Sequence, residues 1–473
     1  MLKIIISLIL ILLSSLSFIF SKSINPAYKY IWLWPTVFSI LYILLFIKID
    51  NYKTEIKLTA QFVLFAMFLR FFLYPIILCF SDKSYLGFIH FFVISDEKIY
   101  EATLYGAIDL FFSMIYLFFL VSRKSARTKL ADKKYFFIGG NKIVYLAYIF
   151  FTFLFYIQYG LKYQIINFIS FNLEVGYEML DDVFLILLRQ AIIVASALFI
   201  LLVFDYCRRK YDKTCSLKYL YIALFIGLLN LCIIIGDRRS NQVYVAMLSI
   251  FILSDLFPKF KKNITFLFSM IGFFIIAFIT LYRVGAVKYG SYFNSVNYID
   301  FSLSNILTQM QIYCGGPVSI ASSIIVFENY VKLDISNFIF DFLRSIFGLS
   351  FILKKYGYMT TQLYNMYLYS VDQLNGHLVF GTSYGYIFFG VLGIPLITCL
   401  NITLASIFNR LFINAKTYET KYLFGFCFLR CMSGIYVNTP SYLATITQYL
   451  GSMGLIIIFA RMCVLKKSNN NFV

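Results

Sequence analysis

Residues Met1 to Phe20 read "MLKIIISLILILLSSLSFIF", an apolar run of about the 20 residues that an α-helix needs to cross a bilayer. The run resembles a secretory signal peptide, but no small-x-small cleavage site follows it, and apolar segments continue to the far end of the sequence. We therefore expect this run to be the first transmembrane helix of an integral membrane protein.

The composition of the whole chain supports the same class. Of its 473 residues, 61% are hydrophobic and 13% are charged, a balance that water-soluble proteins of this size do not normally have. Lys and Arg exceed Asp and Glu by 41 to 22, which in a membrane protein indicates basic cytoplasmic loops rather than binding to nucleic acid. The nine cysteines are scattered without a C-x-x-C pair, so neither a disulfide framework nor a cysteine metal site is expected.

Further apolar segments predict an all-α polytopic membrane protein with about 12 transmembrane helices. The predicted spans are residues 4–20, 31–47, 59–80, 104–122, 143–160, 183–206, 217–235, 242–257, 264–282, 384–407, 421–436 and 443–462. Accordingly, we expect nine helices in residues 1–282, a large external loop in residues 283–383, and three helices with a short cytoplasmic tail in residues 384–473.

The distribution of basic residues orients these spans. The stretches "SRKSARTKLADKK" and "CRRKYDKTCSLK" fall on the same side when the connections are assigned alternately to the two faces. Cytoplasmic loops carry the excess of Lys and Arg in multi-pass proteins. Both termini are therefore predicted to lie in the cytoplasm, and the large loop outside.

Within the large loop, "DISNFIFDFLRSIFGLSFILKK" (residues 334–355) has apolar residues at helical spacing. They are Ile335, Phe338, Ile339, Phe342, Leu343, Ile346 and Phe347. This spacing predicts a one-sided helix that lies at the membrane interface. Two alternatives stay open, namely a re-entrant segment and an additional span at residues 305–327.

A short external connection, "IIIGDRRSNQ" (residues 233–242), carries two arginines against the positive-inside tendency. Arg238 and Arg239 lie at the expected start of a helix, whose free N–H groups and dipole favour anions. Arg283 opens the large loop on the same face. Since guanidinium groups bind phosphate oxygens bidentately, the three arginines predict a clamp for a lipid phosphate or pyrophosphate. Each part of this clamp has a structural alternative. Arg238 and Arg239 would be charges that a short loop tolerates without function, and Arg283 would be an interfacial arginine whose charged end reaches the aqueous surface.

Three more arginines, Arg70, Arg189 and Arg430, fall inside predicted spans. Ionisable groups at that depth are costly and usually face a cavity or a partner. Arg70 is near the middle of its span, and Asp109 is among its possible partners. For Arg189, pairing with the nearby acids at residues 181 and 182 and binding of substrate are equally compatible with the sequence.

The chain has two histidines, His90 and His377, both predicted to be external. His377 stands near the end of the large loop in "NGHLVFGTSYGYIFFGVLGIP", and a neutral imidazole there could accept a proton from a sugar hydroxyl. The glycines after it, Gly381, Gly385, Gly390 and Gly393, allow close backbone approach or helix packing. The sequence has no Walker-type phosphate loop, and the first external loop, "SKSINPAYKY", has no acidic residue. No metal and no cofactor are therefore expected.

The arrangement of these motifs resembles that of Wzy-type O-antigen polymerases, with O-antigen ligases as more distant relatives. The resemblance rests on "GDRRS" opening a span, on Arg283 entering a late external loop, and on "GHLVFGTSYGYIFFGVLG" leaving it. The G-T-S-Y element of the family corresponds to residues 381–384, and its F-G-x-x-G element to residues 389–393. His377 matches a histidine of the ligase-like relatives. No acidic residue lies between the two elements, where family members commonly have one.

The resemblance implies a metal-independent glycosyltransferase of the GT-C type in the bacterial inner membrane. It would transfer the growing glycan from its undecaprenyl-pyrophosphate carrier to a new lipid-linked repeat unit on the periplasmic face. Arg238, Arg239 and Arg283 would bind the pyrophosphate, with Arg70 and Arg189 as further binding candidates. His377 and Arg283 would be catalytic.

The expected partners are the carrier-linked oligosaccharide, membrane lipid, a chain-length regulator and a flippase. The amphipathic helix of the large loop would cover the active site and guide the carrier. A lipid-linked oligosaccharide flippase, an O-antigen ligase and a membrane subunit without chemistry are the alternative functions.

Overall fold

The computed structural model describes residues 2–46, 54–82, 85, 87, 94–122, 138–161, 166–168, 183–235, 239–281, 302–369 and 377–470. In these ranges the chain is helical except for turns and one antiparallel pair of short strands, β1 (Ile166–Phe168) and β2 (Ile233–Ile235). It divides into two compact units. The first comprises Met1–Lys129, Asp300–Arg410 and Phe428–Thr447, and the second comprises Leu130–Ile299, Leu411–Cys427 and Gln448–Val473.

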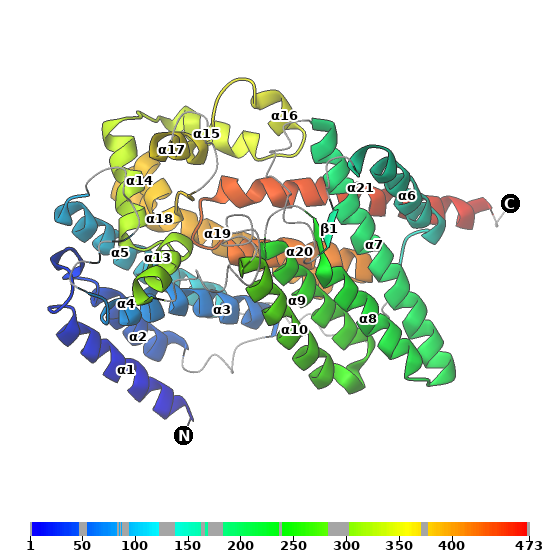
Figure 1. The fold of residues 1–473 in the computed structure, drawn as a ribbon, viewed down its shortest axis with the longest axis horizontal. Coiled ribbons are helices and arrows are strands. Elements are labelled where there is room, and N and C mark those ends of the chain that lie inside the picture. The colour runs from blue at the N-terminus through cyan, green and yellow to red at the C-terminus, as the bar shows by residue number, and fades with distance from the viewer. Residues whose placement is uncertain are drawn as a thin grey trace. The chain divides into compact units, whose positions relative to one another are not determined.

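The first unit holds the N-terminal helices and those of the predicted large loop (Figure 1). Its elements are α1 (Leu2–Phe20), η1 (Pro26–Tyr28), α2 (Leu33–Leu41), η2 (Tyr42–Phe46), α3 (Thr54–Met67), η4 (Phe68–Leu73), α4 (Tyr74–Leu78), α5 (Asp96–Ser122), α13 (Leu303–Cys314), α14 (Pro317–Asn329), α15 (Ile335–Arg344), α16 (Leu349–Leu353), α17 (Thr360–Leu368), α18 (Gly381–Phe389) and η8 (Gly390–Gly393). Helix α5 packs against α2, α3 and α14, and α14 also packs against α18. The predicted loop is therefore folded against the N-terminal spans.

The second unit contains the middle of the chain. Its elements are α6 (Lys142–Phe155), η5 (Tyr156–Gly160), α7 (Val183–Thr214), α8 (Lys218–Cys232), α9 (Arg239–Leu256), η6 (Pro258–Phe260) and α10 (Lys261–Leu281), together with the two strands. Neighbouring helices pack in sequence order, α6 with α7, α7 with α8, α8 with α9 and α9 with α10. Three of the boundaries between the two units fall within the last three helices, α19 (Ile394–Asn414), α20 (Tyr418–Ser433) and α21 (Thr439–Asn470).

Seven helical segments among the described residues are long and apolar enough to cross a membrane. They are Pro26–Leu45, Ile56–Leu78, Asp96–Ser122, Lys142–Gly160, Val183–Thr214, Gly381–Asn414 and Thr439–Val464. Each coincides with a predicted span, so the prediction of an all-α polytopic membrane protein is confirmed. Shorter apolar helices at Ile4–Phe20, Lys218–Cys232 and Val243–Leu256 match three more predicted spans. The count of twelve and the GT-C architecture stay predictions.

Residues 303–329 of the predicted loop form a bent pair of helices. Helices α13 and α14 meet at 54° and together are apolar enough to be a broken span or a re-entrant loop, one of the alternatives that the sequence left open. The bend lies at Gly315, whose φ of 71° is the left-handed conformation that glycine adopts at least cost.

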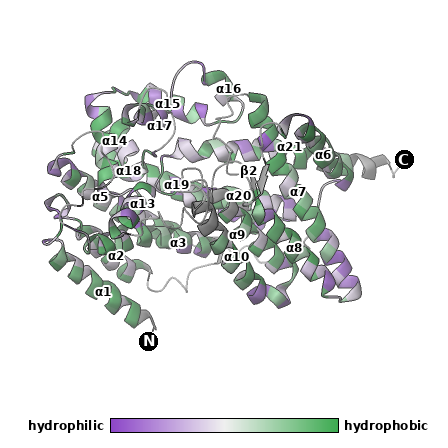
Figure 2. Ribbon diagram, in the orientation of Figure 1, coloured by the Kyte–Doolittle hydropathy of each residue, from purple (hydrophilic) through white to green (hydrophobic). Residues whose placement is uncertain are grey.

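Many helices are hydrophobic along much of their length (Figure 2), and many of their large apolar side chains are exposed. Helix α1 is hydrophobic along nearly its whole length and exposes Ile4, Leu8 and Ile19 by more than 60% each. Soluble proteins rarely expose contiguous apolar surface of this kind. Hydrocarbon is the environment that suits it.

The prediction of a span over residues 217–235 is wrong at its end. Helix α8 stops at Cys232, and Ile233–Ile235 pair with Ile166–Phe168 as β2. Three successive β-branched residues favour an extended backbone, and the partner strand supplies the hydrogen bonds. This pairing brings part of the connection between α6 and α7 beside the end of α8.

The glycines after G-T-S-Y allow two backbones to meet. A Cβ atom added at Gly385 would overlap with the carbonyl oxygen of Gly393, and one added at Gly393 would overlap with that of Gly385. Helix α18 therefore turns directly against η8, which begins at Gly390 with a φ of 63°.

We predict that Gly385→Ala lowers the stability of the detergent-solubilised protein by about 1–3 kcal/mol, because the backbone of η8 must move to admit the methyl group. Gly454→Ala is the matched control, since it lies in helix α21 with only Leu423, at 3.9 Å, near the added Cβ. Alanine there should be neutral or stabilising. Thermal unfolding of both variants measures the difference, and equal melting temperatures would contradict the close approach.

Candidate functional site

A buried ion pair joins two membrane-spanning segments of the first unit. Arg70 lies on the π-helical turn η4, between α3 and α4, and Asp109 lies in α5. Both side chains are completely buried, with Arg70 Nη1 3.6 Å from Asp109 Oδ2. π-Helical turns inside α-helices are frequent at functional sites. Asp109, one of the possible partners that the sequence offered for Arg70, is therefore its partner in the structure.

Thr382, the second residue of G-T-S-Y, connects the two charges. Arg70 Nη2 donates a hydrogen bond to Thr382 Oγ1 over 3.0 Å, and the Thr382 hydroxyl donates to Asp109 Oδ2 over 2.7 Å. Helix α18, which begins with this motif, is therefore tied to both η4 and α5. The motif takes part in the buried charge network.

Aromatic rings enclose the Arg70 guanidinium. Its central carbon is 4.5 Å from the ring centre of Tyr436, 4.7 Å from that of Phe71, 5.8 Å from Phe380 and 6.0 Å from Trp34. Cation–π attraction at these distances stabilises a desolvated cation. Arg70 Nε and Nη1 have no hydrogen-bond partner among the described residues, so the contacts that stabilise the guanidinium are the rings, Asp109 and the bond from Nη2 to Thr382.

Tyr384, the last residue of G-T-S-Y, contacts a second buried carboxylate. Its hydroxyl donates to Asp341 Oδ2 over 2.8 Å, and the backbone N–H of Thr360 donates to Asp341 Oδ1 over 3.0 Å. Burial raises the pKa of the Asp341 carboxyl, while these hydrogen bonds act in the opposite direction. The motif is thus anchored at both of its ends, to Arg70 and Asp109 by Thr382 and to Asp341 by Tyr384.

The segment before the motif is fixed by a short bridge. Phe380 pairs with Val437 in antiparallel fashion, Gly381 N donates to Tyr436 O over 2.6 Å, and Asn438 Nδ2 donates to Val379 O over 2.7 Å. Backbone and amide groups thus hold the entry to α18 in one conformation.

His377 is held by its backbone and by an aromatic neighbour. The side chain of Asn365 accepts a hydrogen bond from His377 N over 2.6 Å and donates one to His377 O over 2.9 Å. The imidazole stacks on Tyr369, with ring centres 5.5 Å apart and planes 4° from parallel. Burial lowers the pKa of the imidazole from its ordinary value of 6.5, so the neutral form prevails at pH 7.

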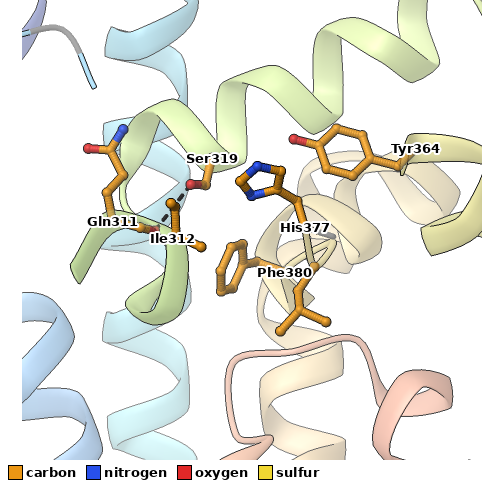
Figure 3. Close-up of a pocket in the computed structure, with 7 residues that line it drawn as sticks. Gln311, Ile312, Ser319, Tyr364, His377 and Phe380 are labelled. Atoms are coloured by element: carbon orange, nitrogen blue, oxygen red, sulfur yellow. Dashed lines mark hydrogen bonds between the residues drawn. The ribbon is translucent and has the colours of Figure 1, made fainter. Parts of the chain in front are cut away.

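A small cavity adjoins His377 (Figure 3). Its lining residues are Gln311, Ile312, Ser319, Tyr364, His377, Leu378 and Phe380. It has room for about one water-sized group. Figure 3 shows the imidazole between Ser319 and Tyr364, with the Ser319 hydroxyl donating to Gln311 O over 3.1 Å. An imidazole and two hydroxyls therefore border this space, and the Tyr364 hydroxyl also hydrogen-bonds with Ser322 Oγ over 2.6 Å.

The predicted site residues fall into three groups. His377 and Arg70 both lie in the first unit, and Phe380 connects them because it lines the cavity and faces the guanidinium. Arg189, partly exposed in α7, belongs to the second unit. Arg239 is the first residue of α9, which agrees with the expected helix start. Its side chain, and the whole of Arg238, Arg283 and His90, lie outside the described residues.

The sequence did not single out several residues of the site, among them Asp341, Asn365, Tyr364, Gln311 and Ser319. Asp341 had a detectable signal, because it is the acidic residue within an apolar helical repeat, whereas the others are polar residues of ordinary loop composition. Among the described residues, no group of three or more His, Cys, Asp or Glu side chains converges as metal ligands would.

Comparison of the chain with models of protein families, with curated proteins and with solved structures found no match.

We predict that Arg70→Met and Asp109→Leu each destabilise the protein by about 3–5 kcal/mol, because each leaves an unpaired buried charge. The double variant should lose less stability than the two single variants lose together. Thermal unfolding in detergent of the four proteins measures this coupling.

Two variants test Thr382, the third residue of this network. Thr382→Ser keeps the bridging hydroxyl and should be less destabilising than Thr382→Val, which removes it. Additive single-variant losses, or equal effects of serine and valine, would show that the three residues do not act together.

Proposed function

We propose that this protein polymerises undecaprenyl-pyrophosphate-linked oligosaccharide repeat units on the external face of a bacterial inner membrane, as an O-antigen polymerase does. The proposal rests on the resemblance of "GDRRS", Arg283 and "GTSYGYIFFGVLG" to the polymerase family. The multi-pass helical fold suits a lipid-linked substrate, since it carries apolar outer surfaces along its spans.

One observation carries the assignment of the site. The G-T-S-Y segment, which looked like a loop-end motif in the sequence, begins helix α18 and bonds two buried acidic groups, Asp109 and Asp341. His377, a few residues before it, lines a cavity with hydroxyl groups. A fixed motif and, beside it in the chain, a candidate base held by Asn365 form the arrangement that a transferase of this kind would need.

The proposed reaction is a substitution at the anomeric carbon of the growing glycan. A hydroxyl oxygen of the acceptor sugar forms the new glycosidic bond, and the bond from the anomeric carbon to the carrier pyrophosphate breaks. The hydroxyl proton passes to the neutral imidazole of His377, whose pKa is already lowered by burial. The bonding electrons leave with the pyrophosphate.

Charge on the departing pyrophosphate needs fixed cations. Arg238, Arg239 and Arg283 are the proposed clamp, and Arg239 is the first residue of α9. Guanidinium groups and the helix N-terminus both favour phosphate oxygens without reorganising during the reaction. Arg70 stays a proposed contributor, and its burial against Asp109 suits positioning of the motif.

Deletion of the gene, followed by electrophoresis of the surface glycan, separates the polymerase from its alternatives. A single repeat unit attached to its acceptor supports the polymerase. Absence of any repeat indicates the flippase, and polymer left on its carrier indicates the ligase. Either of the last two outcomes would overturn the proposal.

We predict that His377→Ala lowers turnover of purified protein on lipid-linked repeats by about 10²–10⁴-fold, the usual contribution of a general base. The pH profile of the native protein should fall only below about pH 6.5, because the base must be deprotonated and its pKa is lowered. His90→Ala, the other histidine, is the control and should keep turnover. Undiminished turnover of His377→Ala would remove the imidazole from the reaction.

We predict that Arg238→Ala and Arg283→Ala each lower turnover by about 10²–10³-fold, as expected when a donor to a developing oxyanion is lost. Lysine at either position should recover part of the activity, since it keeps the charge but not the bidentate geometry. Arg410→Ala, at an exposed arginine in α19, is the matched control. Full-length polymer from either alanine variant at normal expression would contradict the clamp.

A further inference from the structure

Helix α15 has its polarity reversed relative to a helix on the surface of a soluble protein. It buries Asp341 and Arg344, which are 2% and 7% exposed. The opposite side exposes Ile335 and Ile339, by 54% and 53%. The sequence pattern predicted a one-sided helix at the membrane interface, and the structure adds that Asp341 and Arg344 occupy its inner face.

The inner polar groups are satisfied within the protein. Asp341 accepts hydrogen bonds from Tyr384 and Thr360, as described above, and Arg344 Nη1 donates to Gly357 O over 2.6 Å. The helix end is fixed by Thr447, whose hydroxyl donates to Ser345 O over 2.6 Å. The orientation of α15 is thus specified by several contacts, and rotation about its axis would break them.

The apolar row continues beyond α15 into α16. Leu343, Ile346, Leu349 and Ile352 are exposed by 43%, 40%, 40% and 59%. The exposed residues Lys354, Lys355 and Tyr356 follow directly, Tyr356 by 77%. Basic and aromatic residues at the end of an apolar surface are typical of the boundary between hydrocarbon and phosphate headgroups.

We infer that α15 and α16 lie in the membrane at the level of the upper acyl chains, with the isoleucine and leucine row in contact with lipid. Lys354 and Lys355 then reach the phosphate headgroups. Hydrocarbon accounts for the exposed row, and the internal hydrogen bonds account for the buried charges. The inference does not depend on the proposed reaction.

This placement gives α15 two roles. Its outer face contacts lipid, while Asp341 on its inner face bonds Tyr384 of G-T-S-Y. The motif, which begins the span Gly381–Asn414, is therefore also connected to the lipid-facing surface through α15, and a helix fixed in lipid keeps Asp341 in place.

Tryptophan quenching in proteoliposomes tests the placement. Ile339→Trp and, as a second variant one turn away, Ile335→Trp are each reconstituted with lipid that carries bromine on its acyl chains. The unaltered chain, which contains two tryptophans, supplies the baseline to be subtracted. Lys332→Trp, at an exposed position before the helix, is the matched control.

Brominated lipid should quench the added fluorescence of Ile339→Trp and Ile335→Trp by at least half, and aqueous iodide should leave it nearly unchanged. Lys332→Trp should show the opposite pattern. Quenching of both isoleucine variants by iodide would place the row in water. Quenching by neither reagent would show that protein, from a second copy or from the same chain, covers the row, and either result overturns the inference.

Discussion

The pairing of Arg70 with Asp109 is the constraint on which the first unit depends. Two opposite charges that are completely buried in apolar segments are tolerated only when they stay together. Keeping them together fixes η4 against α5, and Thr382 extends the constraint to the start of α18. Aromatic rings close around the guanidinium and shield it from solvent.

The motif that resembles the polymerase family is therefore built into the core of the unit. Its threonine contacts the buried pair and its tyrosine contacts Asp341, which belongs to the lipid-facing helix α15. The preceding His377 is clamped by Asn365 at the edge of a small cavity. This connection of membrane interior, candidate base and membrane surface is why we locate the proposed chemistry here.

Much of the fold could be predicted from the sequence, because apolar length alone marks membrane spans. The site was less accessible. Arg70 was conspicuous by its depth, but choosing Asp109 as its partner requires helix packing, which the periodicity does not encode. Asp341 could be noticed as an acidic residue within an apolar repeat, but its inward orientation follows from bonds to distant residues. The isoleucines of β2 continued a hydrophobic run, so only their pairing with β1 shows that α8 ends at Cys232.

The central claim is that this chain joins lipid-linked repeat units. The most direct test is to reconstitute the purified protein with one defined undecaprenyl-pyrophosphate-linked repeat unit and to record the products by mass spectrometry. The account predicts carrier-linked products that grow by whole repeat units, with one undecaprenyl pyrophosphate released for each bond formed. A substrate that stays at one repeat unit, whether or not it crosses the bilayer, would contradict it.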